Sequence, residues 1–346
     1  MMRPSNARRI SSIRLLNQQL VAPLYSRPDE VVEWMGMVQA QEYRMMRWAV
    51  IMRMKRSSMD AFRRAYDSGR IIRTHLFRCT WQLVAAEDLH WMRRLCAEQN
   101  RRMINGYLAS FGRRITEAQY DRINNLLREL LSDCDSLRKS DLLRRLEEEG
   151  VKDDAHTMSI YLRRAEIDGV ICSGHLDAEN TYALVERRVA QGPDFSREAS
   201  LEKLARRYFR SHAPATLDDF VWWSGLGVRE CRRAVEAIST ELEQLDGVAA
   251  PLYIHRDSRT RGCRFKTLCL PSYDEYLIGY KSRHYALECE FQSRAYNNFG
   301  IFYPVIVSGG KVVGNWHPKK RTSDFFKEEY RENSNGLQRP PVGLFV

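Results

Sequence analysis

The sequence predicts a mainly α-helical α+β fold, in which tandem helix-turn-helix units with β wings are followed by a β-rich C-terminal region. Two observations predict this class. Helical spacing of apolar residues recurs up to residue 242, with short β-prone runs after groups of helices. From residue 248 onwards, β-prone runs broken by glycine and proline replace the helical pattern. The chain has 346 residues, which suits two or three packed units.

The first unit is expected over residues 1–135. Apolar periodicity and a capping box predict three helices and then a β element, in winged-helix order, at 8–21, 29–41, 57–69 and 71–84. Two more helices, over 86–105 and 116–133, extend this unit.

The second and third units repeat this order. In the second unit, over 136–192, two helices precede two short strands, at 138–149, 155–168, 169–172 and 181–185. In the third unit, over 193–346, three helices are expected at 196–211, 217–224 and 228–242. The clearest hairpin of its β-rich region joins 301–307 to 311–316 through a turn of small residues.

Composition narrows the class of protein. Hydrophobic residues make up 44% of the chain, which excludes wholesale disorder, and no run approaches the roughly 18 apolar residues that span a bilayer. The basic N-terminus lacks the apolar stretch of a secretory signal, so we expect a soluble protein in the cytoplasm, associated with the nucleoid. The eight cysteines form no CxxC pair and fit no zinc spacing, so we expect reduced thiols and no metal.

The charge points to a polyanionic partner. The formal net charge is +11, and arginine pairs with phosphate through a planar fork of donors. Double-stranded DNA is therefore the partner expected first. The candidate phosphate contacts are Arg73, Arg78, Arg163, Arg164, Lys281, Arg283, Lys319 and Lys320, and the alternative for each is an ordinary solvated basic face. The slim hairpin tip of Gly309, Gly310 and Lys311 is a candidate for the minor groove, with an ordinary surface hairpin as the alternative.

Several segments, in one order along the chain, resemble the winged-helix DNA glycosylases of the AlkZ and YcaQ type. They are Gly36–Glu42 with its Gln-x-Gln pattern, Arg73–Val84, Ala213–Thr216 with Trp223–Leu226, Leu270–Arg283, and Gly310–Trp316. The sequence departs from the family at two positions, with Cys79 where glycine is usual and Gln82 where histidine is usual. If that histidine contacts DNA or orders the active site, its replacement by Gln82 puts the activity of this chain in question.

The resemblance implies a catalytic role for Gln39 and Gln41. In glycosidic hydrolysis positive charge gathers on the sugar, and an N-alkylated purine is already a good leaving group. The protein must then mainly orient water and stabilise that charge, which a glutamine amide can do. We expect Gln39 to contact the target nucleotide and Gln41 to position water. Glu42 and Asp274 are candidates for catalytic support, and Asp274 has a structural ion pair as its alternative.

The expected activity is that of a monofunctional glycosylase, acting without a cofactor and as a monomer. Its substrates would be N7-alkylguanine and N3-alkyladenine in duplex DNA, with interstrand crosslinks also considered. The main rival is a non-enzymatic winged-helix DNA-binding protein or transcriptional regulator, which would need neither glutamine. A narrower version of the same chemistry is self-resistance to one DNA-alkylating natural product.

Overall fold

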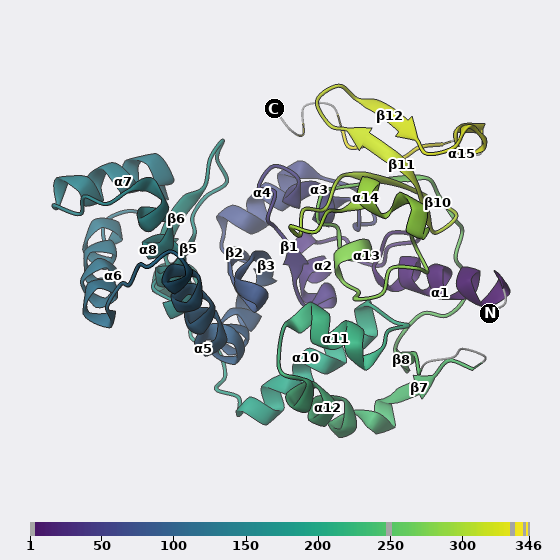
Figure 1. The fold of residues 1–346 in the computed structure, drawn as a ribbon, viewed down its shortest axis with the longest axis horizontal. Coiled ribbons are helices and arrows are strands. Elements are labelled where there is room, and N and C mark those ends of the chain that lie inside the picture. The colour runs from purple at the N-terminus through teal and green to yellow at the C-terminus, as the bar shows by residue number, and fades with distance from the viewer. Residues whose placement is uncertain (1–3, 247–250, 333–335, 342–343, 345–346) are drawn as a thin grey trace. The chain divides into compact units, whose positions relative to one another are not determined.

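The computed structural model describes residues 4–246, 251–332, 336–341 and 344, and these form two compact units (Figure 1). Unit 1 combines the chain up to Phe62 with the chain from Leu201 onwards, and unit 2 covers Arg63–Ser200. Helices and strands both contribute, as the predicted α+β class requires. The three predicted units are defined by element order, so their boundaries remain a prediction. None of the helices in the described ranges is long and apolar enough to cross a membrane.

The N-terminal part of unit 1 places the Gln-x-Gln segment at the end of a short helix. It contains α1 (Pro4–Asn17), α2 (Pro28–Met35), β1 (Val38–Gln39), α3 (Met46–Ile51) and the start of α4 (Met59–Asp67). The helix expected over 29–41 was predicted too long. Gly36 adopts a φ of 80°, a conformation that L-residues rarely adopt, and the chain leaves the helix there. Gln39 therefore lies in β1, and Gln41 lies in the turn that follows.

The C-terminal part of unit 1 begins with three helices. They are α10 (Arg197–Ser211), α11 (Leu217–Ser224) and α12 (Val228–Ala237). A capping box between Thr216 and Asp219 starts α11 as predicted, and Gly225 in the left-handed region ends it. The helix predicted to reach residue 242 stops at Ala237. Two antiparallel strands follow, β7 (Leu242–Gln244) and β8 (Tyr253–His255).

A four-stranded antiparallel sheet lies in the last part of unit 1. Its strands, in spatial order, are β12 (Thr322–Phe325), β11 (Lys311–His317), β10 (Val305–Ser308) and β9 (Leu268–Leu270). The predicted hairpin is confirmed, since Val305 pairs with Asn315 and Ser308 with Lys311. The short helices α13, α14 and α15 are Glu275–Ile278, Gln292–Ala295 and Glu328–Glu332.

The core of unit 1 joins residues from both ends of the chain. Ile10 and Ile13 of α1 are fully buried in a cluster with Leu252 and Tyr285. The indole of Trp48 donates to the Cys269 carbonyl oxygen at 2.7 Å, which ties α3 to β9. This packing holds the segment after α2 against the sheet region.

Unit 2 starts with a β-hairpin and a long helix. The single β element expected over 71–84 is two antiparallel strands, β2 (Ile71–His75) and β3 (Trp81–Ala85), separated by a short 3-10 turn at Phe77–Cys79. The helix α5 (Ala86–Ser110) runs five residues beyond its expected end. The elements that follow are α6 (Glu117–Leu131), β4 (Leu137–Arg138), α7 (Lys139–Glu148), α8 (Ala155–Asp168), β5 (Ile171–Ser173), β6 (Thr181–Leu184) and α9 (Val185–Arg188). The strands β4, β6 and β5 form a three-stranded antiparallel sheet in that order.

Candidate catalytic segment and nucleic-acid interface

The two predicted catalytic glutamines differ in exposure. Gln39 is buried, with only 4% of its surface exposed, whereas Gln41 lies exposed two residues later. The backbone N–H of Gln39 donates to Oε1 of Glu275 at 2.8 Å. The fold therefore anchors the segment through Gln39 and presents Gln41 to solvent.

Glu275, which with Asp274 was a candidate for a catalytic carboxylate or a structural ion pair, belongs to a buried polar network. Its Oε2 accepts from the indole N–H of Trp223 at 3.1 Å and lies 3.4 Å from Nε2 of His212. Nδ1 of His212 lies 2.8 Å from the Ser211 hydroxyl, and burial lowers the pKa of His212 below its usual value. Although these residues are of the types found in nucleophilic triads, Ser211 and His212 are fully buried. The network instead holds the carboxylate that fixes the Gln39 backbone.

Asp274 forms the structural ion pair that was considered as its alternative role. Its two oxygens accept from the Arg53 guanidinium at 2.8 and 2.9 Å, and Oδ1 also caps α13 by accepting from the Tyr276 N–H. Both Asp274 and Arg53 are buried. Asp274 can therefore support catalysis only through the backbone that it holds.

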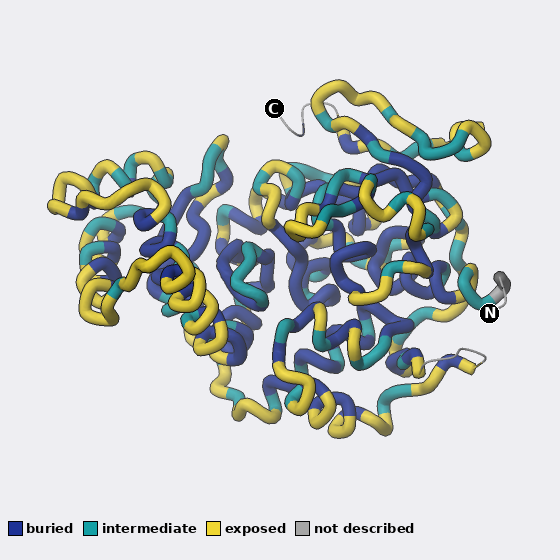
Figure 2. The backbone as a smooth tube through the Cα atoms, in the orientation of Figure 1, coloured by how far each residue is buried: buried dark blue, intermediate teal, exposed yellow. Residues whose placement is uncertain are grey.

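A pocket opens beside the exposed glutamine. Its volume is about 350 Å³, and two turns line it, one directly after Gln41 and one between β11 and β12. The lining residues are Glu42, Arg44 and Met45 from the first turn, His317 from the end of β11, and Pro318, Lys319 and Lys320 from the second turn. Arg44, Lys319 and Lys320 are exposed, and Figure 2 shows the β11–β12 turn as exposed backbone. The carboxylate of Glu42, several basic side chains and the apolar Met45 and Pro318 thus line a pocket that begins at the residue after Gln41.

Lys281 and Arg283, two further candidate phosphate contacts of unit 1, differ from each other in burial and in hydrogen-bond partners. Lys281 is exposed and pairs with Asp218 at 2.8 Å. Arg283 is half-buried, donates through Nε to the Leu277 carbonyl oxygen at 2.9 Å, and has its pKa lowered by burial. The guanidinium of Arg283 lies against the rings of Trp222, Tyr296 and Phe302, and its contact with phosphate stays a prediction.

In unit 2 two predicted phosphate contacts are buried and need correction. Arg73 lies in β2, stacks 4.3 Å from the centre of the Trp81 ring, and donates to Asn180 at 3.0 Å. Arg164 faces the interior, where it pairs with Asp168 at 2.9 Å and with Glu117. Neither guanidinium can reach a phosphate in this structure. Arg78 and Arg163 are half-buried.

The predicted minor-groove hairpin also packs inward. The Gly310 carbonyl oxygen accepts from the Tyr276 hydroxyl at 2.7 Å, and a Cβ at position 310 would lie 2.6 Å from Cβ of Ser11 in α1. Lys311 donates to the His284 carbonyl oxygen at 3.3 Å. Only Gly309 of these three is exposed, so the expectation of an inserted tip is corrected.

The two departures from the family pattern lie in unit 2. The Gln82 side chain is buried and closes the β2–β3 hairpin, since its amide accepts from the Phe77 N–H at 3.1 Å and donates to the Phe77 carbonyl oxygen at 3.2 Å. Cys79 packs against the apolar core, and burial raises its pKa to about 11. Both residues therefore have structural roles inside the unit.

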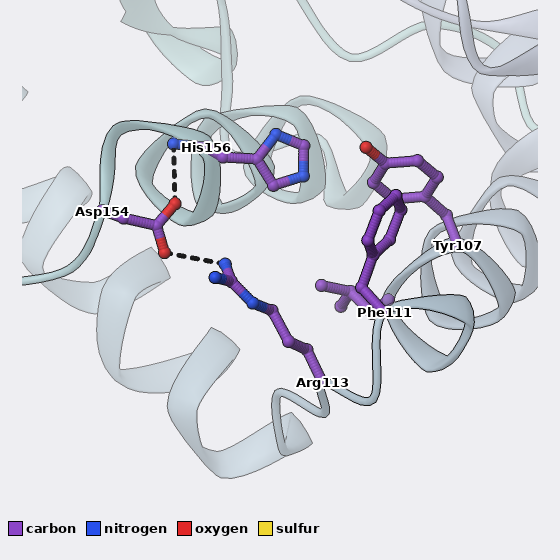
Figure 3. Close-up of a pocket in the computed structure, with 6 residues that line it drawn as sticks. Tyr107, Phe111, Arg113, Asp154 and His156 are labelled. Atoms are coloured by element: carbon purple, nitrogen blue, oxygen red, sulfur yellow. Dashed lines mark hydrogen bonds and ion pairs between the residues drawn. The ribbon is translucent and has the colours of Figure 1, made fainter.

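A second pocket, in unit 2, is less suited to an anion. Its volume is about 360 Å³, and Figure 3 shows Tyr107, Phe111 and His156 facing it. Asp154 caps α8 and pairs with Arg113 at 2.7 Å, and its hydrogen bonds to Thr157 lower its pKa to about 2. This carboxylate already occupies the helix N-terminus, where an anion would bind. Within the described ranges, no group of three or more His, Cys, Asp or Glu residues could hold a metal ion.

Comparisons with known proteins agree with this fold. A family model for AlkZ-like DNA glycosylases matches residues 32–325. The DNA glycosylase AlkZ of Streptomyces sahachiroi has a similar structure, with a TM-score of 0.74 and 19% identity over 99% of this chain and 94% of that one. No curated protein matches the sequence. Since the family model covers most of the chain, the protein belongs to the AlkZ-like DNA glycosylases and is a glycosylase enzyme.

Proposed function

We propose that the protein is a monofunctional glycosylase that hydrolyses the N-glycosidic bond of N-alkylated purines in duplex DNA and leaves an abasic site. The observation that carries this proposal is the exposed Gln41 beside a pocket lined by Glu42 and by cations of the β11–β12 turn. Membership of a glycosylase family gives that arrangement its chemistry.

The proposed chemistry needs few groups. A purine alkylated at N7 or N3 carries positive charge and departs without a proton donor, while positive charge develops on the sugar. Gln41 would accept a hydrogen bond from the attacking water, and Glu42 would lie near the developing charge. Lys319 and Lys320 would hold the phosphates beside the lesion. Because Gln39 is buried, we propose that it acts by fixing this segment through Glu275.

We also propose that the chain binds DNA through winged-helix units. In unit 2 the order α6, β4, α7, α8, β5, β6 with a three-stranded sheet supports one such unit. In unit 1 the order α10, α11, α12, β7, β8 supports another, and Ala215 forms an isolated β-bridge with Tyr253 of β8. A lesion whose sugar is open to water in the duplex needs little base flipping, so crosslinks at the same purine positions are further candidate substrates.

The test is excision from a duplex that carries N7-methylguanine, measured as heat- or base-labile abasic sites. We expect Gln41→Ala to lower the single-turnover excision rate about 100-fold, as removal of one transition-state contact typically does. Gln191→Ala, at an exposed glutamine outside the helices and strands, is the matched control and should excise at the wild-type rate. Gln39→Ala keeps the backbone N–H that donates to Glu275, so slower excision by this variant would report a role of the Gln39 side chain itself.

Three outcomes would separate the alternatives. Binding of the duplex without excision would favour the regulator considered from the sequence. Excision that survives both Gln39→Ala and Gln41→Ala would overturn the assignment of these glutamines but leave the reaction intact. Excision of one bulky adduct but not of N7-methylguanine would favour the self-resistance role.

A further inference from the structure

One aromatic side chain of unit 1 projects into solvent far more than its type usually does. Phe299 is 91% exposed in the turn between Tyr296 and Phe302, and Ile301 of the same turn is 42% exposed. Transfer of a phenylalanine side chain from water to an apolar site is favourable, so a partner that covers this ring would gain binding free energy.

The turn that carries Phe299 is tightly built. The Asn297 side-chain oxygen accepts from the N–H groups of Phe299 at 3.0 Å and Ile301 at 3.1 Å. The Asn297 N–H donates to the Ile301 carbonyl oxygen at 3.0 Å, and Gly300 supplies the φ of 77° that the turn requires. The ring is therefore presented on a preformed backbone.

The base of the turn is also braced. Tyr296 and Phe302 pair as an isolated β-bridge and their rings stack at 5.0 Å. The Arg283 guanidinium lies 4.6 Å from the Tyr296 ring centre and 5.0 Å from that of Phe302. The Leu277 carbonyl oxygen accepts a hydrogen bond from Nε of Arg283 and so holds this guanidinium in place. We call Tyr296, Phe302 and Arg283, which form the base of the turn, the aromatic platform.

A chain of contacts links this platform to the candidate site. The Tyr273 ring lies 6.1 Å from the Phe302 ring, and the N–H of the preceding Ser272 donates to the sulfur of Met45 at 3.3 Å. Met45 lines the pocket next to Gln41. Burial and the charge of Glu42 both raise the pKa of Tyr273, as this proximity implies. Phe299 thus projects from the part of unit 1 that carries the exposed glutamine.

We propose that Phe299, flanked by Ile301, is a wedge that inserts between base pairs of duplex DNA. Apolar side chains inserted at base steps unstack them partly and kink the duplex by about 20–90°. A single ring held out on a turn fits that use, whereas a stable protein interface needs a broad patch of about 800 Å² per partner. The proposal rests on the DNA-binding part of the proposed function and not on excision.

The experiment uses the full chain and an undamaged duplex labelled at both ends with a fluorescence donor and acceptor. Wild-type protein should bring the ends closer, and Phe299→Ala should abolish that change and lower affinity about tenfold, as loss of one aromatic–base stack does. The slope of affinity against salt should stay the same, because no phosphate contact is lost. Phe299→Leu should retain the kink.

Two control variants make the test specific. Phe111→Ala removes another exposed phenylalanine, 64% exposed on unit 2, and Asn298→Ala removes an exposed polar side chain of the same turn. Both should behave as wild type, and all variants should unfold at the wild-type temperature. If Phe299→Ala binds and bends the duplex as wild type does, the wedge is refuted and a protein partner becomes the better explanation. Because no lesion is present, failure of excision would not affect this result.

Discussion

The two hairpins that share β11 have opposite surroundings. The β10–β11 tip has small residues and a lysine, which suit a narrow groove, but Gly310 packs against Ser11 of α1. The β11–β12 turn has Lys319 and Lys320 in solvent and forms one wall of the pocket beside Gln41. Residue types at a hairpin tip therefore do not decide which tip meets a ligand. The decisive factor is what the rest of the chain packs against each tip.

The largest effect should come from adding a side chain at Gly310, in the packed tip of the β10–β11 hairpin. Gly310→Ala adds a Cβ that overlaps Ser11 at a φ of 85°, so we expect a loss of about 3 kcal/mol in the free energy of unfolding. Gly309→Ala is the matched control, because no atom lies within 4 Å of its Cβ, and backbone strain at its φ of 58° should cost only about 1 kcal/mol. Urea unfolding measures both. Equal losses would mean that the β10–β11 tip is free after all.

A smaller effect should come from loosening the Gln39–Gln41 segment, which directly precedes the first turn that lines the pocket. Glu275→Gln replaces a carboxylate oxygen with an amide N–H facing the donors around it, so the Gln39 backbone loses its fixed acceptor. We expect the excision rate at saturating enzyme to fall about thirtyfold, with DNA affinity unchanged. Asp218→Asn, the same exchange at an exposed carboxylate, should leave the rate unchanged. If Glu275→Gln weakens binding and rate equally, Glu275 has only a general structural role.

The smallest effect should come from removing the two lysines of the β11–β12 turn. The double variant Lys319→Ala, Lys320→Ala should lower duplex affinity about tenfold and reduce the salt slope by about one for each lysine. Lys311→Ala should leave the slope unchanged, since that amine donates to a backbone carbonyl. Titration of binding at several salt concentrations measures both. A change of slope for Lys311→Ala alone would reverse the comparison between the two hairpins.

Much of the secondary structure could be predicted because its signals are local. The capping box of Thr216 and Asp219 starts α11, and Asp154 and Gly169 bracket α8, each within a few residues of the helix end that they determine. The prediction failed after α2, where Gly36 leaves the helix inside a run of helix-forming residues. It also missed α3, a fully buried helix without a polar face to give it periodicity.

The candidate site was predicted only in part. Gln41 and the lysines of the β11–β12 turn are exposed as a DNA-contacting role requires, but Gln39, Arg73 and Arg164 are buried. Charge and residue type are visible in a sequence, whereas the partner that neutralises a given charge is not. Nothing near Arg164 in the sequence indicates that Glu117 would meet it.

The sequence by itself determined the mixed helix-and-strand class, the bounds of helices such as α8 and α11, and the family, because these depend on short-range patterns and on motif order. Only the tertiary structure decided which polar groups face solvent. Arg53 and Asp274 are 221 residues apart and pair inside the fold, and Glu275 reaches the Gln39 backbone from 236 residues away. Burial of a charge requires a partner, and such partners come together only when distant segments pack.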